Sequence, residues 1–146
     1  MRILNRRARR DYEVMEEVEA GVVLSGAEVK SLRGEKGNLT EAFVRIKDGE
    51  VWLHNMVIPQ YSHAGSSGYD PGRGRKLLLH RREILALQKK MEGRNLTLVP
   101  LACYTTGRYV KVKIGLARGR KKYEKRELKK RQDIDREVER ALKDRY

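Results

Sequence analysis

The sequence predicts a mainly β fold: a small closed barrel with two or three short helices and a basic C-terminal tail. Two alternating apolar and polar runs are each folded back by turn residues, and a longer extended segment precedes them. The apolar pattern ends after Ala117, and 146 residues suit one hydrophobic core better than two. We therefore expect one folded domain over residues 1–117, with a basic lead-in over residues 1–10, and a separate tail over residues 118–146.

An extended segment and a short helix are expected before the first hairpin. Apolar residues recur over residues 12–24 and favour a strand, although several glutamates blur its alternation. Helix-forming residues then lie between Gly26 and Gly34, with Val29 and Leu32 three positions apart on one face. This pattern predicts a helix of two turns.

Two β-hairpins are the clearest local signals. Asp48-Gly49 joins two alternating runs, and this pair tolerates the positive φ angles of a type I′ turn. The second hairpin joins residues 96–104 to residues 108–114. In its returning strand Val110 and Val112 face the core, whereas Tyr109 and Lys111 point the other way and form a basic face with an aromatic.

The segment between the hairpins contains a predicted loop and a helix. Residues 65–76 are rich in glycine and contain a proline, so we expect a loop. Residues 81–92 place apolar side chains on one helical stripe, and Gly93 is positioned to end that helix. Five or six strands with inserted helices favour an OB-like barrel, because closure removes exposed edges. An open α+β sandwich is the alternative.

The charge of the chain points to a polyanionic partner. There are 34 Lys and Arg against 20 Asp and Glu, a formal net charge of +14. Residues 118–131 alone carry nine positive and two negative charges. The tail has no core of its own, so we expect it to be disordered when free and helical when bound, with Ile134, Val138 and Leu142 at helical spacing.

Composition argues against a membrane protein and against a disulfide-stabilised one. No run approaches the about 18 apolar residues that a spanning helix needs, so we expect a cytoplasmic protein without a membrane partner. Cys103 is the only cysteine and cannot form an internal disulfide. We expect it to be buried in a strand as a small apolar group.

The sequence lacks the residue patterns of a catalytic or metal site. His54, His63 and His80 show no metal-ligand spacing, and there is no nucleophile elbow. The glycines near Arg73 lack the lysine and hydroxyl residue that end a phosphate-binding loop. We therefore expect no catalytic residues, no metal, no cofactor and no enzyme activity.

Several blocks along the chain follow one another in the order of a known sequence pattern: residues 5–9, 19–33, 38–39, 73–80, 97–101 and 111–119. These blocks resemble the SmpB (small protein B) family, the tmRNA-binding partners of bacterial ribosome rescue. The chain departs from the family pattern at Phe43, where tyrosine is frequent, and at Glu124, where aspartate is usual. The resemblance covers nearly the whole chain.

The resemblance implies an OB-like barrel that grips the tRNA-like domain of tmRNA and reads its shape. Proteins recognise folded RNA through phosphates, 2′-hydroxyls and unstacked bases, so basic side chains and loops are the expected contacts. For Glu19, direct RNA contact and a structural role are equally open. The implied tmRNA contacts are Asn5, Arg6, Arg7, Glu19, Arg33, Arg73, Arg75 and Lys76.

The resemblance also implies that the tail enters the small ribosomal subunit near the decoding centre and mRNA channel. A polycationic tail can fold into a helix when RNA surrounds it and neutralises its charge. Such a tail fits only into a channel that holds no mRNA, so its binding distinguishes an empty channel from a filled one. Tyr123 is the only aromatic in the basic stretch and can stack on an unpaired base. The implied ribosome contacts are Arg118, Arg120, Lys121, Lys122, Tyr123, Lys125 and Arg126.

Two other functions fit a small basic barrel. A structural ribosomal protein has the same charge and size but stays with every ribosome. A phosphodiester-cleaving enzyme on a similar barrel would degrade RNA. The partners expected from the resemblance are tmRNA and the ribosome, bound by a monomer.

Overall fold

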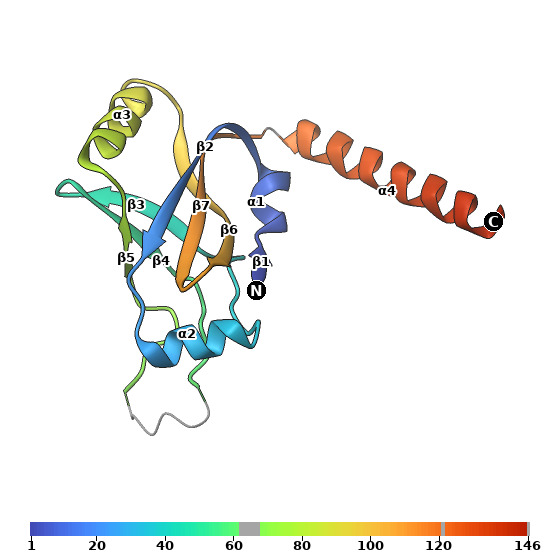
Figure 1. Cartoon of the computed structure of the whole chain (residues 1–146). Coiled ribbons are helices and arrows are strands. Elements are labelled where there is room, and N and C mark those ends of the chain that lie inside the picture. Colours follow the sequence, from blue (N-terminus) through green and yellow to red (C-terminus); the bar gives the residue numbers. More distant parts are fainter. Residues whose placement is uncertain (62–67, 121, 146) are drawn as a thin grey trace.

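Seven strands and four helices occur along the described residues (Figure 1). The computed structural model describes residues 1–61, 68–120 and 122–145, without the side chains of residues 122–125 and 144–145; His63 lies outside it. The elements in chain order are β1 (Arg2–Leu4), α1 (Arg6–Asp11), β2 (Tyr12–Val22), α2 (Gly26–Arg33), β3 (Phe43–Lys47), β4 (Glu50–His54), β5 (Arg75–Leu78), α3 (Arg81–Met91), β6 (Thr97–Thr106), β7 (Tyr109–Gly119) and α4 (Lys122–Arg145).

All of these strands form one antiparallel sheet in the order β1-β6-β7-β2-β5-β4-β3, which confirms the mainly β prediction. Both hairpins are confirmed, β3 with β4 and β6 with β7. Asp48 and Gly49 have φ angles of 52° and 75°, as a type I′ turn requires. Gly107, at the second turn, also has a positive φ, of 60°.

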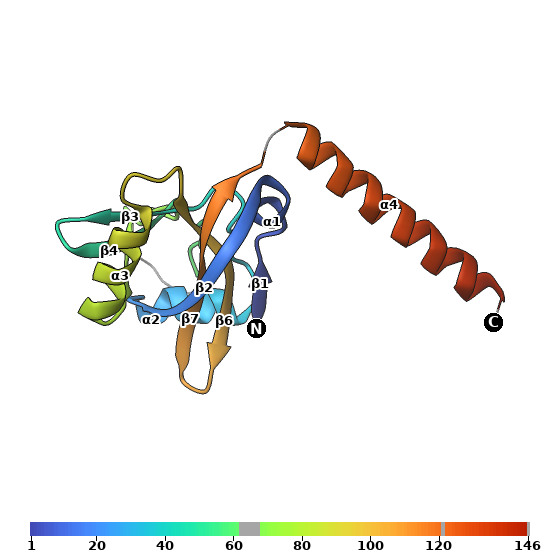
Figure 2. The same cartoon turned by 90° about the horizontal axis from the view of Figure 1, so that it is seen from above.

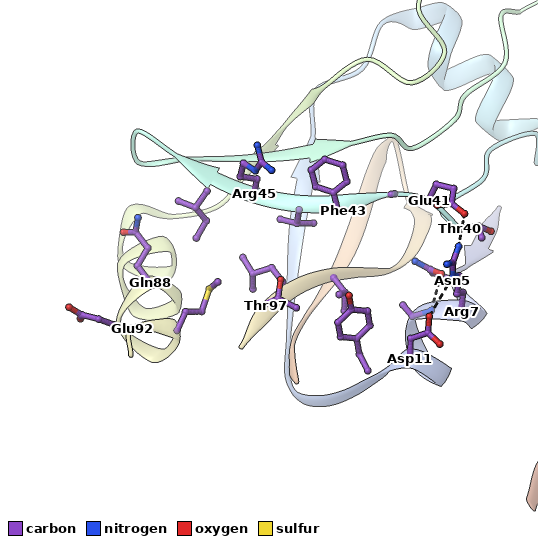
Figure 3. Close-up of a pocket in the computed structure, with 18 residues that line it drawn as sticks. Asn5, Arg7, Asp11, Thr40, Glu41, Phe43, Arg45, Gln88, Glu92 and Thr97 are labelled. Carbon is purple, nitrogen blue, oxygen red and sulfur yellow. Dashed lines mark hydrogen bonds and ion pairs between the residues drawn. The ribbon is translucent and has the colours of Figure 1, made fainter. Parts of the chain in front are cut away.

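The sheet is not closed, so the closed-barrel prediction is not borne out at the level of strand pairing. No ladder among the described residues joins the end strands β1 and β3. Instead, a groove of about 750 Å³ runs along the seam between β3 and β6, with α1 at one end and α3 at the other (Figure 3). Val44 of β3 and Leu98 of β6 belong to the same buried cluster, so side-chain packing joins the strands where hydrogen bonds do not.

Three elements escaped the sequence analysis. The lead-in contains β1 and α1, and the expected loop ends in β5, so Arg75 and Lys76 lie on a strand. β1 has only three residues, too few to show alternation. α1 begins because the Asn5 side chain accepts a hydrogen bond from the Ala8 N–H at 3.1 Å. β5 is short but pairs with strands on both sides, β2 and β4.

Both faces of the sheet bury apolar side chains. The main core includes Leu32 of α2, Leu87 of α3 and Ile114 of β7. A smaller cluster forms on the other face, where Ala8 of α1 packs with Leu101. The burial of Cys103 in the main core confirms its expected role as an apolar filler, and this burial raises the pKa of its thiol to about 12.

The tail is helical in this structure and extends away from the sheet (Figures 1 and 2). The helical spacing of its apolar residues is confirmed, and Ile134, Val138 and Leu142 are each about half exposed. Disorder of the free tail stays a prediction. Among the described helices none is long and apolar enough to cross a membrane.

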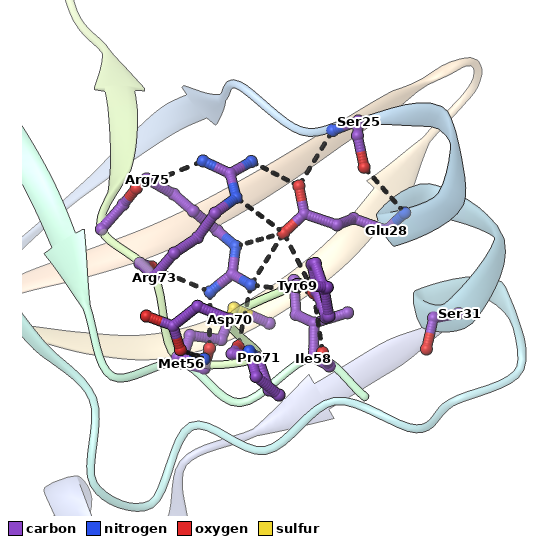
Figure 4. A network of polar contacts seen from close by, with 12 residues as sticks. Ser25, Glu28, Ser31, Met56, Ile58, Tyr69, Asp70, Pro71, Arg73 and Arg75 are labelled. Atoms are coloured by element: carbon purple, nitrogen blue, oxygen red, sulfur yellow. Dashed lines mark hydrogen bonds and ion pairs between the residues drawn. The ribbon is translucent and has the colours of Figure 1, made fainter. Parts of the chain in front are cut away.

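A buried ion pair fastens α2 to β5 (Figure 4). Glu28 and Arg75 are 1% and 0% exposed. The Arg75 Nε donates to Glu28 Oε2 at 2.8 Å, and the Arg73 Nε donates to the same oxygen at 3.2 Å. The other carboxylate oxygen, Oε1, accepts from the backbone N–H of Ser25 at 2.9 Å, which completes the capping box of α2.

The remaining donors of Arg75 hold two further chain segments in place. Its Nη1 donates to the Met56 carbonyl at 2.6 Å, and its Nη2 donates to the Pro71 carbonyl at 2.9 Å. The same Nη2 lies 3.3 Å from the Tyr69 hydroxyl, which in turn donates to the Ile58 carbonyl at 2.7 Å. The segments around residues 56–58 and 69–71 are therefore tied to the strand by one guanidinium.

The charged form of Glu28 is favoured strongly in the folded protein. Burial alone would raise its pKa, but hydrogen bonds from Arg73, the Ser25 N–H and Arg75 outweigh burial and hold the pKa at about 2. Because this pKa lies below the unfolded value, the resulting stability is present above about pH 4.5 and is lost as the pH falls toward 2.

We predict that Glu28→Gln lowers the free energy of unfolding by about 3–5 kcal/mol at pH 7, because Arg75 is left buried without its counter-charge. The variant should also lose less further stability than the wild type between pH 5 and pH 3. Urea unfolding at several pH values measures both effects. Glu41→Gln is the matched control, since its pair with Arg7 is exposed and its loss should cost under about 1 kcal/mol. Equal losses in the two variants would contradict this role for Glu28.

Candidate RNA-binding surfaces

Two of the expected RNA contacts are buried and structural. Asn5 is 4% exposed, and its side-chain N–H groups donate to the carbonyls of Leu39 at 3.1 Å and Pro100 at 2.8 Å. Arg75 is fully buried against Glu28. Neither side chain is free to reach a phosphate, so the expectation of direct contact is corrected for both. Sequence cannot distinguish such residues from surface contacts, because both are polar and lie within basic stretches of the chain.

The other basic residues expected to contact tmRNA are at least partly exposed. Arg73 keeps 38% of its side chain exposed while it pairs with Glu28. The Lys76 Nζ lies 3.7 Å from a carboxylate oxygen of Glu50. Arg7 pairs with Glu41 at 2.5 Å. Within the described residues no ion pair involves Arg6 or Arg33, and both are exposed. These residues lie on several elements and do not converge on one point.

Glu19 has a structural partner in the folded protein. The Tyr104 hydroxyl donates a hydrogen bond to its carboxylate. Burial and this hydrogen bond together raise the pKa of Tyr104 to about 12, so the tyrosine remains a donor. The structural role that the sequence left open is therefore present, and direct RNA contact by Glu19 stays a prediction.

A row of side chains crosses the outer face of the sheet beside Glu19. Directly opposed residues share a face, and the registers place Arg2 opposite Tyr104, Tyr104 opposite Lys111, and Lys111 opposite Gly21. Gly21 in turn lies opposite Leu78 of β5. One row across five strands thus combines two cations, an aromatic ring and an exposed leucine.

This row ends in a groove of about 340 Å³ that the sequence analysis did not identify. Tyr109 is 69% exposed at its rim, and the Lys111 Nζ lies 5.8 Å from the centre of the tyrosine ring. Leu78, 53% exposed, and Arg108 also line the groove. The alternation of side chains predicted that Tyr109 and Lys111 lie on a basic outer face. The sequence did not predict that Leu78 lies beside them, because strand β5, which carries Leu78, was not expected. We call Leu78, Arg108, Tyr109 and Lys111 the β7 groove.

The larger seam groove between β3 and β6 has a different character. Arg7 lies between Asp11 and Glu41 and forms ion pairs with both (Figure 3). The opposite end carries Gln88 and Glu92. The cationic and anionic groups largely offset one another, so this groove does not present the positive potential that favours phosphate. In the part of the chain that is described, no group of three His, Cys, Asp or Glu side chains could hold a metal ion.

The beginning of the tail is attached to the sheet body. Arg118 pairs with Glu13 of β2, and the Arg120 N–H donates to the Asp11 carbonyl at 2.8 Å. The Arg120 Nε is buried and has no hydrogen-bond partner among the described residues. Arg126 is exposed on α4. Lys121 lies outside the described residues, and so do the side chains of Lys122, Tyr123 and Lys125, whose backbone belongs to α4.

Comparison with known proteins gives a consistent family assignment. An SsrA-binding protein of Carboxydothermus hydrogenoformans is 48% identical over 142 residues, which span 97% of this chain and 95% of that protein. The SsrA-binding protein of Sulfurihydrogenibium sp. is 50% identical over 139 residues, 95% of this chain and 91% of that protein.

A solved structure and a family model agree with these relatives. A chain described as "tmRNA-SmpB: a journey to the center of the bacterial ribosome" is similar with a TM-score of 0.68 and 50% sequence identity, covering 83% of this chain and 85% of that chain. The family model described as SmpB protein matches residues 2–144. The chain therefore belongs to the SmpB protein family.

Proposed function

We propose that this chain is a tmRNA-binding protein of ribosome rescue by trans-translation. Its sheet body binds the tRNA-like domain of tmRNA, and its tail probes the empty mRNA channel and decoding centre of a stalled ribosome. The relatives named as SsrA-binding proteins, and the solved relative described with tmRNA in the ribosome, support these partners. We also propose that the protein acts in the cytoplasm, as a monomer and without enzyme activity.

The observation that carries the proposal is the β7 groove with the row that leads into it. Lys111 and Arg108 supply positive charge, and within the described residues neither forms an ion pair. Tyr109 supplies a ring of which most is exposed, while Leu78 gives an apolar floor. Folded RNA offers phosphates, riboses and a few unstacked loop bases, which suit this combination of groups.

Further cations, which lie on several elements outside the β7 groove, complete the proposed tmRNA contacts. We propose that Arg6, Arg7, Arg33, Arg73 and Lys76 contact the tmRNA backbone, and that Glu19 accepts from a ribose or base donor when it is not held by Tyr104. Arg73 donates to Glu28 through Nε and Nη2 and to the Gly74 carbonyl through Nη1, which leaves one N–H on each Nη atom for RNA. The curved sheet and its shared core across β3 and β6 support an OB-like architecture that is open at the seam.

The tail is a second functional unit in this proposal, over residues 118–146. Its first half, residues 118–131, carries nine cations against two anions, and its second half is nearly balanced. We propose that the free tail is disordered or frays, and that ribosomal RNA stabilises the helix by neutralising the first half. Arg118, Arg120, Lys121, Lys122, Lys125 and Arg126 are the proposed phosphate contacts.

We predict that Tyr109→Ala weakens binding of the tRNA-like domain of tmRNA by about 5- to 150-fold, the effect of losing about 1–3 kcal/mol of base stacking. Tyr109→Phe should bind nearly as well as the wild type, because stacking uses the ring and not the hydroxyl. Lys111→Ala should also weaken binding and should reduce its salt dependence. Fluorescence anisotropy with labelled RNA measures each dissociation constant.

Lys89→Ala is the control for these variants, since Lys89 is an exposed lysine on α3 outside the β7 groove. Its affinity for the RNA should match that of the wild type. If Lys89→Ala and Lys111→Ala weaken binding equally, general charge and not the groove holds the RNA. Unchanged binding by both Tyr109→Ala and Lys111→Ala would refute the groove as the tmRNA site.

A separate prediction concerns Tyr123 in the tail. Tyr123→Ala should slow peptidyl transfer to tmRNA on a stalled ribosome and leave tmRNA binding in solution intact, because we propose that its ring stacks on a decoding-centre base. Tyr123→Phe should transfer at nearly the wild-type rate. Single-turnover transfer assays with both variants provide the measurement. Normal transfer by the alanine variant would remove the stacking role, and equal damage from phenylalanine would assign the role to the hydroxyl.

A further inference from the structure

The outer face of the β3–β4 hairpin carries aromatic and cationic side chains that the proposed function does not use. Register places Phe43 opposite His54 and Arg45 opposite Trp52, so these four side chains leave the sheet on the same side. The residues that alternate with them, such as Val51 and Leu53, are buried in the core. We call this surface the hairpin platform, made of Phe43, Arg45, Lys47, Trp52 and His54.

The rings of the platform are ordered against one another. The Phe43 and His54 rings stack with centroids 5.1 Å apart and planes inclined by 27°. The Arg45 guanidinium lies 5.5 Å from the centre of the Phe43 ring, and Figure 3 shows these two side chains next to each other on β3. Gly74 of the neighbouring segment lies flat against His54, since an added Cβ would be 3.2 Å from two atoms of that ring. The cluster is therefore prepacked before any ligand arrives.

Trp52 forms one wall of a hollow of about 470 Å³ on this face. Its indole is only partly buried, and within the described residues it makes no hydrogen bond. Arg45 and Lys47 line the same hollow and form no ion pair in the described part of the chain. This size is within the range of about 300–1,000 Å³ for sites that hold small organic groups.

Two carboxylates limit how a ligand can lie in the hollow. Asp48 and Glu50 are at its turn end, and Glu50 lies 3.7 Å from the Lys76 Nζ. An anionic group is thus disfavoured at the turn and favoured near Arg45, which lies in the middle of the hairpin opposite Trp52. The hollow combines a flat aromatic wall with positive charge on one side.

We propose that the hairpin platform binds an unpaired RNA base, which stacks on Trp52 while Arg45 neutralises an adjoining phosphate and Lys47, opposite Glu50, contributes less. Single-stranded RNA presents an accessible base face next to a phosphate, whereas a duplex hides the faces of its bases. The site is separate from the β7 groove, and the inference does not depend on the identity of the RNA proposed for that groove.

Trp52 is the only tryptophan of the chain, so its fluorescence reports on this site alone. Titration of the full chain with an unstructured RNA octanucleotide should quench the emission in a saturable manner. A duplex of the same length and polyglutamate serve as controls for charge without exposed bases. Absence of quenching by the octanucleotide, or equal quenching by polyglutamate, would overturn the proposal.

Variants locate the contact on the platform. Arg45→Ala should raise the octanucleotide concentration at half-quenching at least fivefold, and Lys47→Ala should have a smaller effect because Lys47 lies opposite Glu50. Lys89→Ala should have none. By anisotropy with labelled octanucleotide, Trp52→Ala should bind about 5- to 150-fold more weakly and Trp52→Phe within about threefold of the wild type.

Arg45 is exposed, so Arg45→Ala keeps the test decisive even if Trp52→Ala does not fold. Quenching that is unchanged by Arg45→Ala would refute the site. The same variants should bind the tRNA-like domain of tmRNA normally, because they leave the β7 groove intact. Failure of the platform and failure of the proposed function are therefore measured separately.

Discussion

The ion pair between Glu28 and Arg75 is the contact on which the arrangement of this protein depends. It joins the first turn of α2 to the short strand β5, and Arg75 also binds the carbonyls of Met56 and Pro71. β5 is the strand that links the β3–β4 hairpin to the rest of the sheet. Loss of this pair would leave a buried charge and loosen the connection between the two halves of the sheet. Both proposed RNA sites include residues positioned by β5 or by the segment leading into it.

One face of the sheet is used mainly for packing, and the other is largely exposed. The inner face holds the main apolar core, and the small cluster under α1 covers one part of the outer face, so the rest of the outer face is free to carry charges and rings. Ion pairs neutralise part of that outer charge: Glu16, Glu17 and Glu13 each have a basic partner. Among the described residues, Arg45 and Lys111 form no ion pair and lie beside the rings of Phe43 and Tyr109. We propose that RNA binds at these two surfaces, because no ion pair has to be broken before these cations contact a phosphate. The tail differs from the sheet body, since the apolar side chains described on α4, Ile134, Val138 and Leu142, are about half exposed.

Alternation and turn chemistry predicted both hairpins, α2, α3 and the helical spacing of the tail, because these depend on neighbours close in sequence. β1 and β5 were not predicted because each is too short to show a periodic pattern and forms only by pairing with strands distant in sequence.

Contacts between residues distant in sequence also limited the prediction of the site. Tyr109 and Lys111 were visible on a basic strand face, but Leu78 joins them only through β5. The sequence predicted Asn5 and Arg75 as surface contacts for RNA. In the structure their side chains are buried and donate hydrogen bonds to carbonyls distant in sequence, so they stabilise the fold. Barrel closure was inferred from strand number, which does not determine whether the end strands pair.

The central claim is that the sheet body binds tmRNA by itself and that the tail serves the ribosome. A chain ending at Arg120 tests it most directly, because β7 runs to Gly119 and the Arg120 N–H still bonds to the Asp11 carbonyl of the body. The dissociation constant for the tRNA-like domain of tmRNA is compared between this chain and the full one. Our account predicts values within about tenfold of each other, together with loss of peptidyl transfer on stalled ribosomes. A loss of affinity greater than a hundredfold would place the main tmRNA site in the tail and contradict the account.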